Sequence, residues 1–265
     1  MNNKANLRIP LFRKLIKYYI KLLKFMYPPL SRNKITLSMI THNEENRYLF
    51  DVLLSLLPTV DTFVILDDFS NDKTVKLIKE IIPKKKLVIN QTNENLCVKN
   101  ESTLRRILGR MTVTTKPDWM LCLDADELFE ENYENVLNNL VNTTLFDYYG
   151  FRLYDMWDDK FHFREDSHWK AHKLYRIFLY RYYPLYPYTW NNRKLHCGRH
   201  PKNIHYFSGK NSQLRIKHLG WMKKEDRIQK YHSYKTLDPQ NEYGNFLQYE
   251  SINDKFPNLI KWKSI

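Results

Sequence analysis

Residues 117–127 read PDWMLCLDADE and place two carboxylates directly after a short apolar run. A continuous apolar run such as 119–123 is typical of a strand buried on both faces of an α/β sheet. Ligands of open α/β sheets bind beyond the carboxyl ends of the strands. Asp124 and Asp126 would therefore lie where they can hold a divalent cation that bridges the phosphates of a nucleotide. Two acids that merely end a strand are the alternative, and the rest of the chain decides between them.

The sequence before this motif alternates between apolar runs and amphipathic patterns. Apolar runs predict strands at 35–40, 62–66 and 87–89. Helices are predicted from an Asn43 cap to Pro58, from a Ser70 cap to Pro83, and through Leu104, Ile107 and Leu108. Strands that alternate with helices of this length imply right-handed crossovers and a parallel sheet.

Polar residues gather where these strands end, at 41–44, 67–68 and 124–126. The carboxyl ends of parallel strands share one edge of the sheet, so the three clusters predict a single site. The sequence has only six glycines, with no G-x-G-x-x-G motif after the first strand and no P-loop motif. A dinucleotide Rossmann site or a P-loop is therefore not expected, and a metal held by Asp126 is the natural candidate to neutralise a bound diphosphate.

The chain is basic, with a formal net charge of +14, and much of the excess lies in residues 8–34, which contain no acid. A basic amphipathic helix is predicted within residues 1–32, because apolar residues recur at three- and four-residue steps until Pro28-Pro29. Those residues are Leu11, Phe12, Leu15, Ile16, Tyr19, Leu22, Leu23 and Met26. Charges interrupt the pattern too often for a transmembrane span or a signal peptide. Residues 8–27 either contact an anionic membrane surface or dock on the rest of the chain with a solvated basic face.

The three cysteines, Cys97, Cys122 and Cys197, are widely spaced, which argues against a disulfide framework and a Cys-based zinc site. A reducing compartment fits this usage, so we expect a cytoplasmic protein that is not secreted and that associates with membrane through its amino-terminal helix. The net charge would also suit nucleic acid, but no RNA-binding signature is present and the charge concentrates on the helix. Nucleic acid is therefore not an expected partner.

Three segments resemble the family 2 glycosyltransferases of GT-A fold: THNEE at 41–45, DDFSNDKT at 67–74 and LDADE at 123–127. Their order and spacing match across residues 35–130, and IKHLGW at 216–221 also resembles a segment of that family. The resemblance implies an α/β fold with a Rossmann-like, mostly parallel central sheet flanked by helices and a smaller acceptor-side lobe. We accordingly expect a nucleotide-sugar-binding half at 33–145, an acceptor-side half at 146–235 and a carboxyl-terminal extension at 236–265.

The resemblance also implies metal-dependent transfer of a sugar from a nucleoside-diphosphate sugar to a glycan or lipid-linked hydroxyl acceptor. It implies that Asp126 ligates Mn²⁺ or Mg²⁺, that Asp124 contacts the metal or the ribose, and that His218 is a further metal or phosphate contact. The residues implied to hold the base and ribose of the donor are Thr41, Asn43, Glu44, Asp67 and Asp68. Asp72 is expected only to cap a helix or to place a charge in its first turn.

Inverting transfer needs a carboxylate that removes the proton of the acceptor hydroxyl. The acidic segments after a strand-like stretch at 146–153 offer Asp166, Glu165 and Asp155, in that order of preference. Trp157 and Trp169 lie nearest to these acids and are expected to stack on sugars. A metal-dependent nucleotidyltransferase or nuclease, or a non-catalytic nucleic-acid binder, is the alternative. The sequence specifies neither the sugar, nor the nucleotide base, nor the acceptor.

Overall fold

The computed structural model describes residues 3–30, 32–143 and 145–264, with side chains from Lys14 onward. Its helices are α1 (Asn3–Met26), α2 (Leu49–Leu56), α3 (Thr74–Ile81), α4 (Leu96–Thr114), α5 (Tyr133–Asn142), α6 (Lys224–Leu237) and α7 (Phe246–Glu250). Its strands are β1 (Ile35–Thr41), β2 (Thr62–Asp67), β3 (Leu87–Gln91), β4 (Trp119–Cys122), β5 (Glu127–Phe129), β6 (Tyr148–Asp155), β7 (His162–Arg164), β8 (Tyr175–Arg181), β9 (Gly209–His218) and β10 (Leu259–Lys261).

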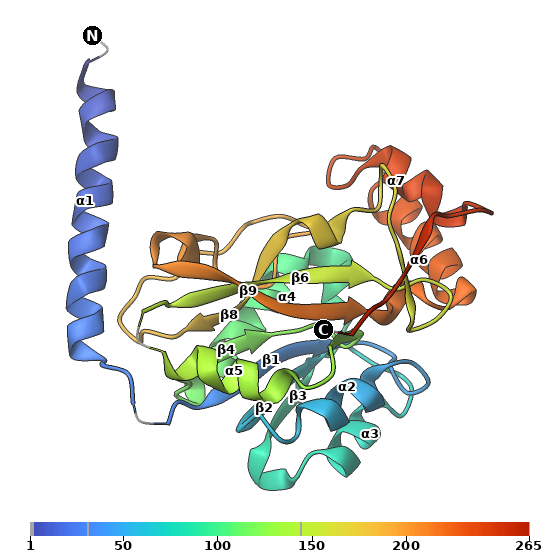
Figure 1. Cartoon of the computed structure of the whole chain (residues 1–265), viewed down its shortest axis with the longest axis horizontal. Coiled ribbons are helices and arrows are strands. Elements are labelled where there is room, and N and C mark those ends of the chain that lie inside the picture. Colours follow the sequence, from blue (N-terminus) through green and yellow to red (C-terminus); the bar gives the residue numbers. More distant parts are fainter. Residues whose placement is uncertain (1–2, 31, 144, 265) are drawn as a thin grey trace.

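One curled sheet runs through the molecule in the strand order β3-β2-β1-β4-β8-β6-β9-β5 (Figure 1). The strands β3, β2, β1 and β4 are parallel, which confirms the four strands predicted from their apolar runs. Beyond β4 the sheet is mixed: β8 is antiparallel to both β4 and β6, β9 is parallel to β6, and β5 is antiparallel to β9. The β4 end, which carries the two aspartates, therefore lies in the middle of the sheet.

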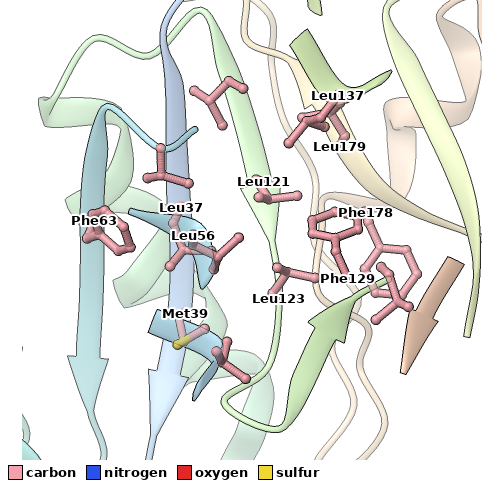
Figure 2. Packing of buried hydrophobic residues seen from close by; sticks show 14 of the residues in the cluster. Leu37, Met39, Leu56, Phe63, Leu121, Leu123, Phe129, Leu137, Phe178 and Leu179 are labelled. Carbon is pink, nitrogen blue, oxygen red and sulfur yellow. The ribbon is translucent and has the colours of Figure 1, made fainter. Parts of the chain in front are cut away.

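Helices cover both faces of the parallel half because alternate strand residues point to opposite sides. Leu37 of β1 and Phe63 of β2 pack with Leu56 of α2 in a core that α3 and α5 also cover (Figure 2). Val64 of β2 faces the other way, against Leu104 of α4. Each of these side chains is fully buried, and such burial contributes about 1.5–3 kcal/mol per large apolar residue. The packing fixes where the strand ends, and hence the site, are placed.

The first two predicted helices begin later than their expected caps. α2 begins at Leu49 and α3 at Thr74, so the predictions that Asn43 and Ser70 cap them were wrong. The Ser70 hydroxyl instead donates to Asp67 at 2.6 Å. The Asp72 carboxylate accepts the Thr74 N–H at 2.9 Å, which confirms its expected role at the start of α3. The polar residues after β1 and β2 therefore connect the two loops by hydrogen bonds. Sequence spacing does not reveal such non-local contacts.

The segment expected as a carboxyl-terminal extension, whose polar sequence predicts an irregular chain, contains regular structure. It contains α7, and β10 pairs antiparallel with β7. The Asp238 carboxylate accepts the N–H groups of Glu242 and Gly244, which folds the chain back after α6. Figure 1 shows α6 and α7 together at one end of the sheet. The prediction failed because this segment is ordered by contacts with distant elements and carries little periodicity of its own.

α1 stands at the opposite end of the molecule (Figure 1), and only one of its faces docks. Ile20 and Leu23 are buried against Tyr183, Tyr186 and Phe207. Outside this contact, Leu15, Leu22 and Phe25 are exposed by 59%, 51% and 85%. The expected apolar residues Leu11 and Phe12 lie outside the described side chains. Within residues 3–30, 32–143 and 145–264, no helix is both long and apolar enough to cross a bilayer.

Candidate active site

Asp67 and Asp68, at the end of β2, are fully buried and organise the loops around them. The Thr41 hydroxyl donates to Asp67 at 3.0 Å. The Asp68 carboxylate accepts the backbone N–H groups of Leu96 and Cys97, each at 2.8 Å. Asp68 thereby satisfies free N–H groups at the start of α4, where a negative charge is stabilising. The structure brings these expected donor-site residues together and engages their carboxylates in protein hydrogen bonds.

Asn43 and Glu44 form the turn after β1. Asn43 has a φ of 53°, and its carboxamide oxygen accepts the Asn71 N–H at 2.9 Å. Glu44 is only 8% exposed, with its Oε1 3.5 Å from Arg47. Its Oε2 is buried and has no hydrogen-bond partner among the described residues. Because an unsatisfied buried acceptor costs about 1–3 kcal/mol, Oε2 is available to a ligand hydroxyl or N–H group.

The burial of Glu44 makes stability depend on pH. Burial raises the pKa of Glu44 from its ordinary value of 4.5 to about 8. The folded state therefore holds this proton more tightly than the unfolded state, and the associated stability is complete below pH 4.5 and lost as the pH rises through about 8. We expect the wild type to lose about 2–3 kcal/mol more unfolding free energy than Glu44→Gln between pH 6 and pH 9. Urea denaturation at both pH values measures this difference.

Glu45→Gln is the matched control for that experiment. A hydrogen bond from the Lys73 backbone N–H lowers the pKa of Glu45, so this neighbour is ionised at both pH values. The control and the wild type should lose stability equally between pH 6 and pH 9. Equal losses in all three proteins would contradict the buried, protonated state of Glu44.

Two arginines hold Asp124, the first acid of the D-x-D motif. Arg105 of α4 lies 3.1 Å from Asp124 Oδ1, and Arg199 lies 3.2 Å from Oδ2. Arg199 also pairs with the buried Glu127, whose carboxylate accepts the Asp124 N–H at 2.8 Å. Burial opposes the ionisation of Asp124, but Arg199 and Arg105 together hold its pKa below the usual range. Both carboxylate oxygens of Asp124 thus have a cationic protein partner.

A separate group of charges surrounds Asp126. Its Oδ2 lies 3.4 Å from His218 Nε2 and 3.4 Å from Lys230 Nζ. Burial opposes the ionisation of Asp126, but His218 and Lys230 hold its pKa well below the usual range. Burial also acts against protonation of His218, yet the Asp126 carboxylate raises its pKa to about 9. Asp126 is therefore ionised, next to the imidazole of His218 and the amino group of Lys230.

Gly220 provides the room for this arrangement. A Cβ atom at Gly220 would lie 2.0 Å from Asp126 Oδ2 and 2.3 Å from Lys230 Nζ. Lys230 Nζ also lies 4.4 Å from the centre of the Trp221 ring, a favourable position for a cation. The Asp126 carboxylate and the face of the Trp221 ring, with the space that Gly220 leaves open, together fit one positively charged group.

Asp126 and His218 also suit a divalent cation. A carboxylate oxygen and an imidazole nitrogen are ligands that Mn²⁺ accepts, and His218 turns Nε2 toward Asp126 because its Nδ1 lies 2.8 Å from Asp155 Oδ1. Such carboxylate–histidine pairs orient metal-binding histidines. Asp124 is less suited, since both of its oxygens face arginines. Among the described residues, no group of three or more His, Cys, Asp or Glu side chains is placed to hold a metal.

A cavity of about 570 Å³ opens beside this site. Asp155 and His218 lie in its wall, and Asp155 is the one carboxylate among the described lining residues. The other lining residues are Leu153, Trp169, Ala171, Arg176, His196, Trp221, Tyr234, Tyr243, Gly244, Asn245, Gln248, Tyr249 and Ile252. The carboxyl-terminal segment therefore builds one wall of the cavity.

The other two candidate bases do not line this cavity. The Asp166 carboxylate lies 2.6 Å from Arg164 Nε and accepts the Trp169 N–H at 3.0 Å. Glu165 pairs with Lys173 at 2.6 Å and lies 3.2 Å from His172. Of the three candidate bases, Asp155 is the one that lines this cavity.

Trp157 is not the exposed sugar platform that the sequence had suggested, and Trp169 lies in the cavity wall with little of its surface exposed. Each is only 1% exposed, and the two rings pack edge to face at 4.9 Å. The Arg164 guanidinium lies over both rings, at 4.6 and 5.0 Å. The two tryptophans pack with Trp221 and Ile252 in a small hydrophobic core beneath the cavity. A tryptophan next to acidic residues in a sequence is equally compatible with burial, which is why the prediction failed for Trp157.

Sequence reasoning missed two cations of the site, Arg105 and Lys230, which belong to distant segments and stand in no motif. Arg199 follows His196 and Cys197 in a segment whose Arg199 or His200 the sequence offered as a phosphate contact. A weak signal existed for Arg105, since it lies on the apolar side of a helix next to Leu104 and Leu108. Nothing local marks Lys230, because α6 is polar around its whole circumference.

Comparisons with known proteins show the family and the fold. The family model described as "Glycosyl transferase family 2" matches residues 36–215. No curated protein matches the sequence. Among solved structures the chain is similar to S. aureus TarS 1-349 in complex with UDP-GlcNAc, with a TM-score of 0.50 and 13% identity over 83% of this chain and 70% of that chain.

The chain is also similar to a longer crystal structure of S. aureus TarS, with a TM-score of 0.49 and 12% identity. That match covers 83% of this chain and 42% of that one, so the chain spans less than half of the longer protein. At such low identity, the TarS 1-349 complex shows a shared fold only, and the family rests on the match over residues 36–215.

Proposed function

Because the chain belongs to glycosyl transferase family 2, we propose that it transfers a sugar from a nucleoside-diphosphate sugar to a hydroxyl group of a glycan or lipid-linked acceptor. The observation that carries the proposal is the row Asp126–His218–Asp155, which connects the end of the central sheet to the large cavity. The donor diphosphate would lie at Asp126, and the acceptor would enter the cavity. Family membership argues against the nuclease and nucleic-acid-binding alternatives.

The diphosphate needs positive charge, and the site offers it from two sources. Lys230 and His218 lie beside Asp126, and Arg105 and Arg199 lie beside Asp124. When His218 gives up its proton, Asp126 and His218 would hold a divalent cation in place of that charge, and the bound cation would stabilise the negative charge of the leaving diphosphate as a Lewis acid. Burial in a partly enclosed site strengthens these interactions relative to water.

Asp155 is the proposed base of an inverting transfer. Its Oδ1 is engaged by His218, while no protein hydrogen bond to Oδ2 is found among the described residues. A carboxylate in the cavity wall can receive the acceptor proton as the hydroxyl attacks the anomeric carbon. Glu44 Oε2 and the turn at Asn43 are the proposed donor contacts, since that oxygen has no protein partner.

Donor binding is the first test of the proposed function. We expect a nucleoside-diphosphate sugar, added with Mn²⁺ at one hundred times its dissociation constant, to add about 2.7 kcal/mol to the unfolding free energy. Thermal unfolding with UDP-, GDP- and dTDP-sugars, with and without Mn²⁺, measures this stabilisation. UDP and UDP-GlcNAc come first, since the TarS structure was solved with the latter. The absence of stabilisation by every donor would contradict the proposal.

The exposed face of α1 is the proposed membrane contact within residues 8–27. Leu22 and Phe25 project into solvent, while Lys14, Lys17 and Lys21 are exposed around them. Apolar side chains flanked by lysines suit the headgroup region of an anionic leaflet. The docked face of α1 holds the helix on the protein by other residues, so the exposed face is free to bind lipid.

We expect the double variant Leu22→Ser and Phe25→Ser to bind anionic vesicles at least about tenfold more weakly, because each apolar side chain buried in lipid contributes about 1.5–3 kcal/mol. Cosedimentation with vesicles of phosphatidylcholine and phosphatidylglycerol measures the affinity. Leu247→Ser, which removes an exposed leucine of α7 at the opposite end of the molecule, is the control and should bind as the wild type does. Unchanged binding of the double variant would rule out this contact.

A further inference from the structure

Arg176 of β8 is a half-buried arginine without an acidic partner. Its one protein hydrogen bond is from Nη1 to the Ala171 carbonyl, at 3.3 Å, and no carboxylate of a described residue lies within 4.0 Å of it. Five other covered arginines have such partners: Arg105 with Asp124, Arg164 with Asp166, Arg199 with Glu127, Arg215 with Glu130 and Arg227 with Asp158. Arg152 and Arg181 also lack a carboxylate partner among the described residues, but neither lines the cavity. A guanidinium carries five N–H donors, so most of those of Arg176 are unused.

The electrostatic environment of Arg176 is also unfavourable without a ligand. Burial lowers the pKa of Arg176 below its ordinary value, since the charged form loses contact with water, and the Asp155 carboxylate offsets this only in part. Removing a charge from water is costly unless an opposite charge or hydrogen bonds compensate it. An anion in the cavity would provide that compensation.

The cavity around Arg176 is suited to an anionic sugar. Trp169, Trp221, Tyr234 and Tyr249 supply aromatic wall, and His196, Asn245 and Gln248 supply polar groups. Asp155, the one carboxylate among the described lining residues, is already paired with His218. The unpaired positive charge in this wall is therefore that of Arg176.

Arg176 lies away from the proposed diphosphate position. It pairs with Phe151 in the sheet, whereas His218 pairs with Asp155, four residues further along β6. Four strand residues span about 13 Å between the two pairing positions, and both side chains line the same cavity, where Arg176 lies near enough to Asp155 for the carboxylate to affect its pKa. A donor diphosphate at Asp126 would leave Arg176 to the other substrate.

We propose that Arg176 binds an oxyanion carried by the acceptor, so that the acceptor is a phosphorylated or carboxylated glycan and not a neutral one. This inference rests on the proposed function, in which the cavity holds the acceptor. The planar guanidinium can bind a phosphate or carboxylate through two parallel hydrogen bonds. The remaining aromatic wall would pack against the sugar ring.

Titrations with three small probes test the proposal on the full chain. Glucose 6-phosphate, glucuronate and glucose are titrated into the protein saturated with UDP and Mn²⁺, and again without nucleotide, with binding followed by ligand-observed NMR. We expect a charged probe to bind about ten- to a hundredfold more tightly than glucose, because charge-assisted hydrogen bonds contribute about 1.5–3 kcal/mol. The phosphate and carboxylate probes distinguish the two kinds of oxyanion.

Arg176→Gln should lose this preference for charged probes while its UDP affinity stays unchanged. Lys173→Gln is the control, since Lys173 pairs with Glu165 and does not line the cavity. Equal binding of glucose and both charged probes to the wild type, or a preference that survives in Arg176→Gln, would overturn the proposal. A loss of UDP affinity in Arg176→Gln would also overturn the proposal, because Arg176 would then bind the donor nucleotide. Failure of the wild type to bind any nucleotide would contradict the proposed function instead, and the titrations without nucleotide would still decide the role of Arg176.

Discussion

Asp126→Asn is expected to lower kcat/KM for sugar transfer by roughly a thousandfold, because a metal or cation that stabilises a leaving group contributes several kcal/mol to the transition state. The substitution keeps the size of the side chain and removes the charge that His218 and Lys230 face at 3.4 Å. Donor binding should weaken as well, and its dependence on Mn²⁺ should disappear. Steady-state turnover and calorimetric titration of the donor measure the two effects separately.

Asp158→Asn is the matched control for this substitution. The Asp158 side chain is 55% exposed and pairs with Arg227, and it does not line the large cavity. Its turnover should stay close to that of the wild type. Retention of metal-dependent donor binding by Asp126→Asn would contradict the assignment of Asp126 to the diphosphate or the metal.

Gly220→Ala is expected to reduce turnover by about a hundredfold, because displacing a reacting group by about 1 Å has effects of this size. The new Cβ would overlap Asp126 Oδ2 at 2.0 Å and Lys230 Nζ at 2.3 Å, so both side chains must move. The atoms that it meets are side-chain ends and not backbone, so the fold should persist. Donor titration and thermal unfolding, measured together, would separate the loss of function from the loss of stability.

Gly109→Ala provides the comparison, since it is also a crowded glycine. Its Cβ would lie 2.8 Å from the Trp190 ring, far in the sequence from the Asp126 cluster. We expect this variant to lose some stability and to keep its donor affinity. If Gly220→Ala bound the donor as well as Gly109→Ala does, the close packing at Gly220 would have no part in the site.

Much of the fold could be predicted because its strong signals are local. The apolar runs at 35–40, 62–66 and 119–123 could only be accommodated as buried strands, and helices of ordinary length separate them. The mixed half of the sheet was beyond the same reasoning. β9 inserts between β6 and β5 although it comes much later in the chain, and no local pattern specifies such a neighbour.

The candidate site was predictable to a similar extent. Strand ends placed Thr41, Asp67 and Asp126 at one edge of the sheet, and the structure brings them there. What those side chains contact was not predictable: Asp68 stabilises α4, and Asp166 binds Arg164. The sequence shows that a residue is acidic, but it does not show whether the carboxylate contacts a ligand, an arginine or a backbone N–H group.

The sequence by itself determined the parallel half of the sheet, the edge that carries the polar motifs and the amphipathic character of α1, because each depends on the spacing of residues that are close in the chain. Only the tertiary structure decided that Lys230 faces Asp126, that Arg176 has no acidic partner among the described residues and that residues between 243 and 252 line the cavity. These contacts join segments far apart in sequence. They depend on the packing of the whole domain, which fixes distances that no local pattern records.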